Sequence, residues 1–304
     1  MRLSKIISFL LSFLIFSSNV SAFSFWFERG AYVTYSALVD EEEYVGILHL
    51  NKTTILRCKG DAFLTFKIVE IDNKVAKINI TLDISRGELI TLHSSGKTER
   101  KEITNVTFSK VLFLNISNME YFDKNGTSYG RATFFIDPRN VRKGTIIGQW
   151  GNATLFINEI ESITNITFLT HFHAFKPPVL LAKTNRISYE GALGGDLFYY
   201  DLSTGILIGG FIPFAPELRA LGISHGSLID QVAQENQKKL LQGLSLEEAL
   251  KLDKRWVAGI VLYDTNIEFE PKTEVKKEET PTKYLFLASL GILLMVVVLR
   301  RRLH

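Results

Sequence analysis

The sequence has one cysteine, Cys58, in 304 residues, so an intrachain disulfide is excluded. Any folded part must therefore be held together by core packing, and the 46% of hydrophobic residues is sufficient for that. Cys58 ends the alternating stretch 55–58, which is typical of a half-buried strand. No motif around it indicates a nucleophile.

The chain also lacks a strong charge of either sign, with 35 Lys and Arg against 32 Asp and Glu. Arg2, Lys5 and Arg300–Arg302 lie at the two ends, which leaves the remainder slightly acidic. No basic stripe interleaved with aromatic residues occurs, so nucleic acid is not expected as a partner. The acidic run 40–43 has no second set of oxygen ligands at loop spacing, which favours a solvated loop over a calcium site.

Long apolar runs are confined to the ends of the chain. Residues 284–299 carry no charge and precede Arg300–Arg302. At 1.5 Å per residue this run would extend about 24 Å, which predicts a transmembrane helix in a slightly thinned bilayer. A buried core helix is the alternative.

At the other end, Arg2 and Lys5 precede the apolar run 6–16. The stretch Val20-Ser21-Ala22 then supplies small residues at the positions that a signal peptidase recognises. This pattern predicts a secretory signal cleaved after Ala22, with an uncleaved signal anchor as the alternative. By the positive-inside rule, we expect a single-pass type I protein of the cell membrane, with its large domain outside. The expected organisation is a signal peptide 1–22, an extracellular β-rich domain 23–270, a polar stalk 271–283, the transmembrane helix 284–299 and a cytoplasmic tail 300–304.

No βαβ alternation occurs between the ends, so the strands should form an antiparallel sheet. Residues 75–84 show this best, because Ile78, Ile80, Leu82 and Ile84 alternate with polar residues. The predicted fold class is mainly β (α+β), with a large bent antiparallel sheet, a sandwich or half-barrel, two late helices packed on it and the C-terminal transmembrane helix. Strands are predicted at 23–38, 44–50, 63–71, 75–84, 89–92, 103–108, 111–116, 131–136, 145–148, 154–160, 166–175, 186–189, 197–200, 206–208 and 256–269.

Turn and cap residues refine this prediction. Asn125-Gly126 indicates a type I′ hairpin turn, and residues 201–205 indicate a hairpin closed by a glycine bulge. Ser227 is expected to cap a helix over 228–242. Ser245 and Glu248 form a capping box for a second helix that ends near Lys251.

Asn-X-Ser/Thr sequons are the strongest surface signal. They occupy seven of the fourteen Asn residues outside the signal, far above chance, which favours N-glycosylation of an exported domain. No sequon occurs after residue 165, and two interpretations remain open. The C-terminal part of the domain faces a partner or the membrane, or the distribution of sequons only reflects where the helices lie. The seven expected glycosylation sites are Asn51, Asn79, Asn105, Asn115, Asn125, Asn152 and Asn165.

Catalytic and metal-binding patterns are weak. Residues 222–226 match the G-x-S-x-G nucleophile elbow around Ser224, but no downstream His on the same side of the membrane completes a triad. His171 and His173 have the spacing of zinc ligands on one strand face, with His49, His93 or His225 as a third ligand. The simpler interpretation is that the two His residues lie on the solvent-exposed face of a strand. Residues 190–196 lack the G-x-G-x-x-G order, so no phosphate site is expected there. Because none of these patterns is complete, no metal and no cofactor is expected.

Several short stretches carry a family resemblance, namely Gly30 to Tyr35, Phe135 to Pro138 with Gly144 to Ile146, Tyr200 to Leu207 and Leu262 to Ile267. They resemble a group of uncharacterised archaeal cell-surface proteins. The resemblance implies a signal peptide, one β-rich ectodomain with a bent, lipoprotein-carrier-like sheet, and a C-terminal anchor. The chain departs from the group at 211–254, and the resemblance implies no catalytic residues.

Two classes of function remain from the sequence. The first is a surface glycoprotein with a binding or structural role, whose partner is a lipid or another surface protein. In this class, Phe211, Ile212, Phe214 and Leu218 would line a space between sheet and helices for an apolar, lipid-like ligand. The alternative is a membrane-anchored extracellular hydrolase or metal-dependent enzyme. The first is preferred because a sheet with one apolar face needs no catalytic constellation to explain it.

Overall fold

The computed structural model describes residues 27–40 and 44–269. The predicted signal peptide, stalk, transmembrane helix and tail lie outside these residues, as does most of the acidic run 40–43. All but the last two described residues belong to one compact unit that ends at Ile267. Among the described residues, no helix has the length and apolar character needed to cross a membrane.

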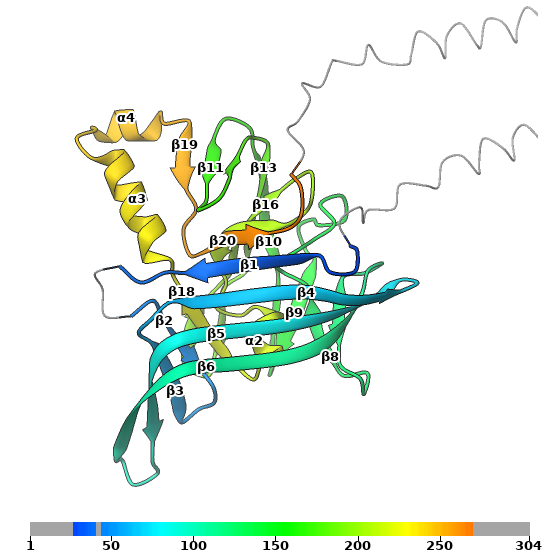
Figure 1. The fold of residues 1–304 in the computed structure, drawn as a ribbon, viewed down its shortest axis with the longest axis vertical. Coiled ribbons are helices and arrows are strands. Elements are labelled where there is room, and N and C mark those ends of the chain that lie inside the picture. The colour runs from blue at the N-terminus through cyan, green and yellow to red at the C-terminus, as the bar shows by residue number, and fades with distance from the viewer. Residues whose placement is uncertain (1–26, 41–43, 270–304) are drawn as a thin grey trace, which may run out of the picture. The chain divides into compact units, whose positions relative to one another are not determined.

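The described chain is mainly β, and its large antiparallel sheet is nearly closed into a barrel (Figure 1). This confirms a mainly β class and a large antiparallel sheet. Along the sheet the strands are β18 (His225–Leu228), β2 (Gly46–His49), β3 (Thr54–Cys58), β5 (Val75–Leu92), β4 (Ala62–Asp72), β1 (Tyr32–Ala37), β20 (Ile260–Thr265), β17 (Leu207–Phe211), β16 (Leu197–Asp201), β13 (Val179–Thr184), β10 (Ala153–Ile163) and β9 (Ile146–Trp150). A branch from β5 adds β6 (Thr98–Asn115), β7 (Glu120–Phe122) and β8 (Ser128–Arg131).

The branch arises because β5 is much longer than predicted. The expected strands 75–84 and 89–92 are one 18-residue strand, and β6 pairs with it from Val75↔Asn115 to Leu92↔Thr98. On its other edge, β5 pairs first with β4 and then with β3. Ile78, Ile80, Leu82 and Ile84 are buried, as their alternation predicts.

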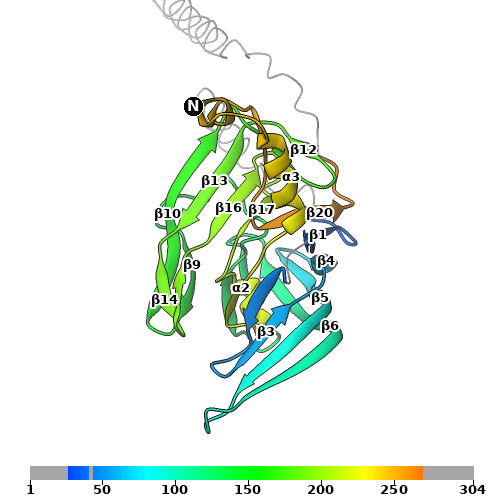
Figure 2. The same ribbon diagram turned by 90° about the vertical axis from the view of Figure 1, so that its left-hand side faces the viewer.

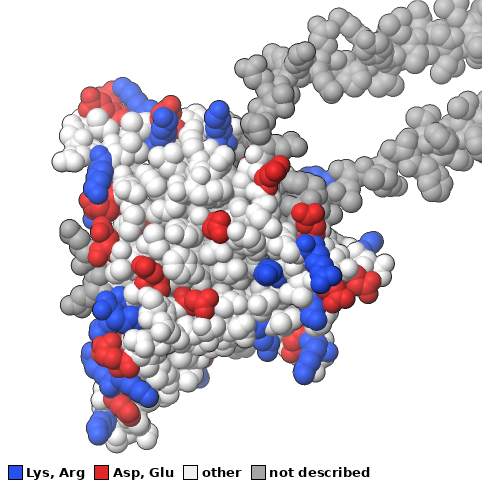
Figure 3. All heavy atoms as spheres, viewed as in Figure 1, with Lys and Arg blue, Asp and Glu red and all other residues white. Residues whose placement is uncertain are grey.

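The opposite face of this part of the sheet is polar but largely uncharged. Figure 3 shows few Lys, Arg, Asp or Glu side chains in the middle of the face over β1, β4, β5 and β6. Hydroxyl and amide side chains pair across the strands there: Thr34 with Thr65 at 3.0 Å between their Oγ1 atoms, and Ser109 with Asn79 at 3.2 Å. Cross-strand pairs of this kind stabilise a solvent-exposed sheet face.

Two small sheets complete the β structure. Strands β11 (Thr167–Leu169), β12 (Ala174–Phe175) and β19 (Lys254–Trp256) form a three-stranded sheet in which β11 and β19 are parallel. This parallel pair is an exception to the predicted antiparallel order. Strands β14 (Ile187–Tyr189) and β15 (Ala192–Gly194) form a separate hairpin.

The helices are α2 (Pro216–Ala220), α3 (Gln231–Leu241) and α4 (Leu246–Leu250). The prediction that Ser227 caps a helix from residue 228 is wrong, because β18 continues to Leu228 and the side chain of Asp230 caps α3 through the Ala233 N–H. The capping box of Ser245 and Glu248 is confirmed.

The late helices add little to the core. Helix α3 buries only Gln231 and Ala233, and α4 buries no residue. They lie at one end of the molecule beside β19 (Figures 1 and 2). The unpredicted helix α2 is the buried one, with Pro216, Glu217, Leu218 and Ala220 inside.

The two predicted hairpin turns have different outcomes. The 201–205 hairpin is confirmed, since Gly205 has a φ of +70° and donates its N–H to the Asp201 carbonyl at 2.8 Å. A type I′ turn at Asn125-Gly126 is wrong, because only Gly126 has a positive φ. The Asp123 side chain instead accepts the N–H groups of Asn125 and Thr127 and builds a wider loop.

Residues 132–137 fill the interior, and we call them the plug. The sequence predicts a strand here, but β8 ends at Arg131 and the chain then crosses the barrel, with all six plug residues buried. Phe134 packs on Tyr35 and Phe66, with ring centroids 4.8 and 4.6 Å away. Its carbonyl accepts the Leu207 N–H at 2.9 Å, which joins the plug to β17.

Gly259 offers a test of the close approach between β20 and β17. Its φ is +90°, and an added Cβ would collide with the Gly210 carbonyl oxygen. We expect Gly259→Ala to lower the free energy of unfolding by about 2–4 kcal/mol, because backbone strain and overpacking add. Chemical unfolding of the purified full-length chain measures this loss.

The matched control is Gly96→Ala. Gly96 also has a positive φ, +80°, but an added Cβ there meets nothing within 4 Å. It should cost only about 1 kcal/mol. Equal losses for the two variants would contradict the close approach of β20 and β17.

Candidate functional site

The sheet stops short of closure where β8 and β9 meet. β8 pairs with β7 and β9 pairs with β10, and no ladder joins β8 to β9. The two edges nevertheless approach closely, because a Cβ at Gly130 would lie 2.5 Å from the Ile147 carbonyl oxygen. We call the boundary between these two strand edges the seam.

A cavity of about 620 Å³ opens beside the seam. This volume lies within the range of about 300–1,000 Å³ that is typical of small-molecule sites. Its floor consists of buried apolar side chains and one buried tyrosine, so a ligand there would be removed from water on that side. The floor residues are Met119, Ala132, Ile136, Ile147, Ile157 and Tyr200.

The rim of the cavity is positively charged. Arg131 is half-buried at the end of β8, and Arg142 and Lys143 are exposed in the loop before β9. In the described part of the chain, none of these three side chains has an acidic partner. The one acid at the cavity, Asp137, is occupied by Arg139, whose Nε and Nη2 lie 2.9 and 3.0 Å from its carboxylate oxygens.

A second hollow of about 330 Å³ adjoins the first along the seam and shares Arg131, Ile146 and Ile147 with it. Arg219 of α2 lines this second hollow. Its guanidinium donates to the Gln149 carbonyl of β9 and lies over the Trp150 ring at 5.7 Å. Glu120 also lines this hollow, and its carboxylate accepts the Ser128 hydroxyl at 2.6 Å. The seam is therefore bordered by more cationic than anionic side chains.

A buried carboxylate fixes the floor of the cavity. Glu217 of α2 accepts the N–H and the hydroxyl of Thr133, both at 2.7 Å. Tyr200, which lines the cavity, donates its hydroxyl to the Thr133 carbonyl at 2.7 Å. Tyr35 donates to the carbonyls of Phe134 and Leu207. Hydrogen bonds to side chains thus hold the plug beside the cavity.

This network contains perturbed titratable groups. Burial raises the pKa of Glu217 to about 7, and burial raises the pKa of Asp196 to about 8, with a further contribution from the Glu217 charge. Asp196 accepts the Phe214 N–H at 3.0 Å through Oδ1, while its buried Oδ2 has no hydrogen-bond partner among the described residues. The interior therefore favours protonated carboxyl groups near neutral pH.

The G-x-S-x-G stretch does not form a nucleophile elbow. The sequence places it before a helix, but residues 225–228 form β18, which pairs with β2. The Ser224 hydroxyl donates to the His49 carbonyl at 2.9 Å, and His225 stacks on His49 with ring centroids 4.0 Å apart. Burial lowers the pKa of both imidazoles. This pair lies outside the seam cavity.

His171 and His173 do not share a strand face. They lie in the turn between β11 and β12, where the His173 N–H donates to the Thr170 hydroxyl at 3.1 Å. His171 Nε2 lies 3.0 Å from the buried Asp230 carboxylate, which also accepts the Ser36 hydroxyl at 2.6 Å. Across the described residues, no group of three or more His, Cys, Asp or Glu is placed to hold a metal.

The sequence-predicted lining residues lie elsewhere than the seam. Phe211 is half-buried at the end of β17, and Ile212, Phe214 and Leu218 are buried. Phe214 packs edge-on against Trp150 at 6.2 Å. None of the four lines the seam cavity or its neighbour. They contribute to the core around α2.

None of the seven sequon asparagines is buried. Asn79 and Asn115 are half-buried on β5 and β6, and the other five are exposed. Asn51 lies in the bend before β3 and Asn115 is the last residue of β6, and the Oδ1 atom of each accepts a backbone N–H two residues later. Five of the seven are therefore exposed to solvent, and Asn79 and Asn115 are partly exposed.

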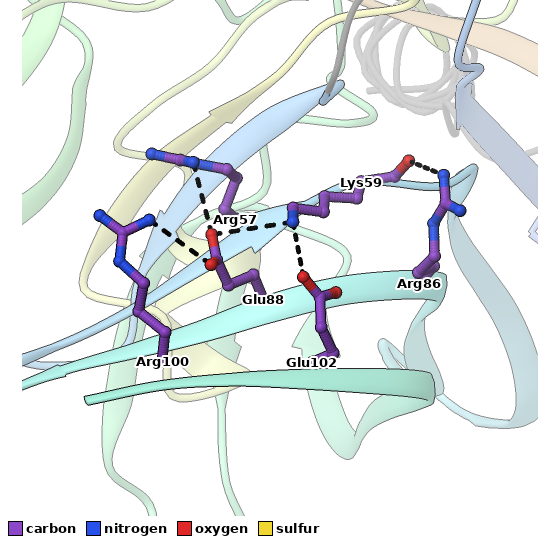
Figure 4. Close-up of polar contacts among 6 residues, drawn as sticks. All are labelled: Arg57, Lys59, Arg86, Glu88, Arg100 and Glu102. Carbon is purple, nitrogen blue, oxygen red and sulfur yellow. Dashed lines mark hydrogen bonds and ion pairs between the residues drawn. The ribbon is translucent and has the colours of Figure 1, made fainter.

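The sheet also carries an ion network that the sequence did not predict (Figure 4). Glu88 of β5 is 7% exposed and lies 3.4 Å from Arg57, 3.9 Å from Lys59 and 3.5 Å from Arg100. Lys59 also contacts Glu102 at 2.6 Å. Each acid there has a cationic partner, so the network links β3, β5 and β6. Cys58 beside it is buried, which raises the pKa of its thiol to about 12 and leaves it unreactive.

Comparisons of the chain with protein families, with characterised proteins and with solved structures found no match. The sequence reasoning did not identify the seam cavity. Its rim contains a visible signal, the pair Arg142-Lys143 between two predicted strands, but the floor is assembled from five separate segments. Only the folded chain brings those segments together.

The buried carboxyl groups predict a pH dependence. Their pKa values exceed the ordinary 3.8 of Asp and 4.5 of Glu. The folded chain therefore binds more protons than the unfolded chain between about pH 4 and pH 8, and stability falls as the pH rises through this window. Asp196→Asn, which can still accept the Phe214 N–H, should flatten that fall by up to about 1.4 kcal/mol per pH unit.

Chemical unfolding of the full-length chain at a series of pH values measures the slope. The matched control is Asp253→Asn, because this carboxyl is exposed and lies outside the network. The control should leave the slope unchanged. If the slope were also unchanged in Asp196→Asn, the buried Asp196 carboxyl group would not be a source of the pH dependence.

Proposed function

We propose that this chain is an exported, N-glycosylated, single-pass surface protein whose β-rich domain binds a small ligand with an apolar body. The observation that carries the binding role is the seam cavity, with its buried floor and open mouth. Burial of apolar surface there contributes about 25 cal/mol per Å², before the cost of ordering the ligand.

The cellular placement has separate support. Residues 1–22 and 284–299 have the patterns of a signal peptide and a membrane anchor, and the sequons occur on accessible residues. The resemblance to archaeal cell-surface proteins favours the same organisation. The C-terminal helix and the type I orientation belong to this proposal.

An anchored hydrolase or metal-dependent enzyme is the less supported class. Ser224 donates its hydroxyl to a backbone carbonyl, and His171 lies beside Asp230, away from the seam cavity. The polar groups that the sequence singled out do not converge on one cleft. A binding role requires only the cavity and its rim.

Photocrosslinking tests the binding role. A neutral long-chain alcohol that carries a diazirine should label the cavity peptides 117–119 and 140–147 of the full-length chain in membranes. Ala132→Phe should reduce this labelling at least several-fold, because the new ring occupies the floor. Ile146→Trp narrows the mouth from a position that is 54% exposed, so it should act similarly without disturbing the core.

Leu193→Phe is the control for this experiment, because Leu193 is 74% exposed and lines neither cavity of the seam. It should leave the labelling unchanged. Labelling that is confined to residues 284–299, or that survives both cavity variants, would remove the proposed function.

Glycopeptide mass spectrometry tests the proposed N-glycosylation. We expect occupancy at the exposed Asn51, Asn105, Asn125, Asn152 and Asn165, and lower occupancy at the half-buried Asn79 and Asn115. Asn118, which is exposed but outside any sequon, serves as the internal control. A native chain at its bare peptide mass would contradict glycosylation.

A further inference from the structure

Several cations of the large sheet form ion pairs with acidic side chains. Lys183 contacts Glu159 at 2.8 Å, and Lys59 contacts Glu102 at 2.6 Å. Arg131, Arg142 and Lys143 come from two segments and line the same cavity, and none of the three forms an ion pair with a described acid. Glu120, the acid opposite Arg131 on β7, accepts hydrogen bonds from Ser128 and Asn118 instead. Like charges repel, so three cations that line one cavity without an ion-pair partner favour the binding of an anion there.

Hydrogen bonds fix the backbone of the loop that carries Arg142 and Lys143. Asp137 accepts the Arg139 N–H and the Asn140 side-chain amide, which fixes the start of the loop. The Arg142 N–H donates to the Thr145 hydroxyl at 3.1 Å. Gly144 and Thr145 then exchange backbone hydrogen bonds with Ile157 of β10 at 2.7 and 2.9 Å. Arg142 and Lys143 are therefore held at the cavity.

We propose that the seam cavity recognises an anionic amphiphile. A carboxylate or phosphate head lies among Arg131, Arg142 and Lys143, and an apolar chain lies on Met119, Ile136 and Ile147. The inference rests on the proposed function and adds the charge of the ligand to it. Arginine suits this role because its planar guanidinium matches both oxyanions.

The cavity should bind a complete anionic amphiphile more tightly than either its head group or its apolar chain alone. The floor beneath the rim is apolar, so a head group without a chain gains only contacts that water and salt weaken. A chain without a charged head leaves three cations unsatisfied. An anionic amphiphile satisfies both parts of the cavity at once.

Competition against the diazirine alcohol in the full-length chain tests the inference. Hexadecanoate and dipalmitoyl phosphatidate should displace the probe from peptides 117–119 and 140–147 at concentrations at least about ten-fold lower than hexadecanol, since a charge-assisted contact is worth about that factor. Hexadecyltrimethylammonium should compete worst. The better of the two anions identifies a free fatty acid or a membrane phospholipid as the source.

Charge variants provide the matched comparison. Arg131→Gln, Arg142→Gln and Lys143→Gln should each raise the half-displacing concentration of the anions about ten-fold and leave that of hexadecanol unchanged. The exposed Lys97 at the end of the β5–β6 hairpin serves as the control, and Lys97→Gln should change neither value. Unchanged labelling by the probe itself shows that each variant is folded.

The outcomes separate the inference from the function on which it rests. Equal competition by hexadecanol and hexadecanoate, or charge variants without effect, would overturn the anionic head while leaving an apolar binding site. Absence of cavity labelling in the unmodified chain would remove both.

Discussion

The fold depends on one buried carboxylate that holds the plug. Burying the Glu217 carboxyl group costs free energy, and the two hydrogen bonds that it accepts from Thr133 at 2.7 Å offset part of that cost. The N–H groups of Thr133 and Phe134 donate to this side chain, so without Glu217 they would be left unsatisfied inside the barrel. The same contact positions α2 against residues 132–137, and the plug in turn bonds to β17 through Phe134 and Leu207. Core, helix and sheet therefore meet at this carboxylate.

The open seam follows from the same constraint. Because the chain turns inward after Arg131, β8 ends at that residue and cannot continue alongside β9. The sheet stays open over that length, and the plug forms part of the wall of the space that remains, through Ala132 and Ile136. The candidate site is thus a consequence of filling the core with a chain segment instead of with side chains alone.

Local patterns predicted the local features of this structure. Alternation identified β4 and the first half of β5, and the Ser245–Glu248 spacing identified a cap, because each depends on neighbouring residues. Strand β13 was missed because nearly all its residues are buried, so it has no alternation. Strand β18 was missed because its pairing with β2 spans most of the chain. The cavity was missed for the same reason, since distant segments form its floor.

The cations at the seam could be explained by edge protection, since unpaired strand edges invite association and charged side chains prevent it. Arg219 fits that role, because its guanidinium donates to the Gln149 carbonyl of β9. Arg131, Arg142 and Lys143 are different, as none of their side chains bonds to a strand carbonyl in the described part of the chain. Arg142 and Lys143 also lie in a loop that β10 holds through Ile157, outside either edge strand. Edge protection therefore accounts for Arg219 and leaves the three cations that line the cavity to a different explanation, for which we propose the anionic head of a ligand.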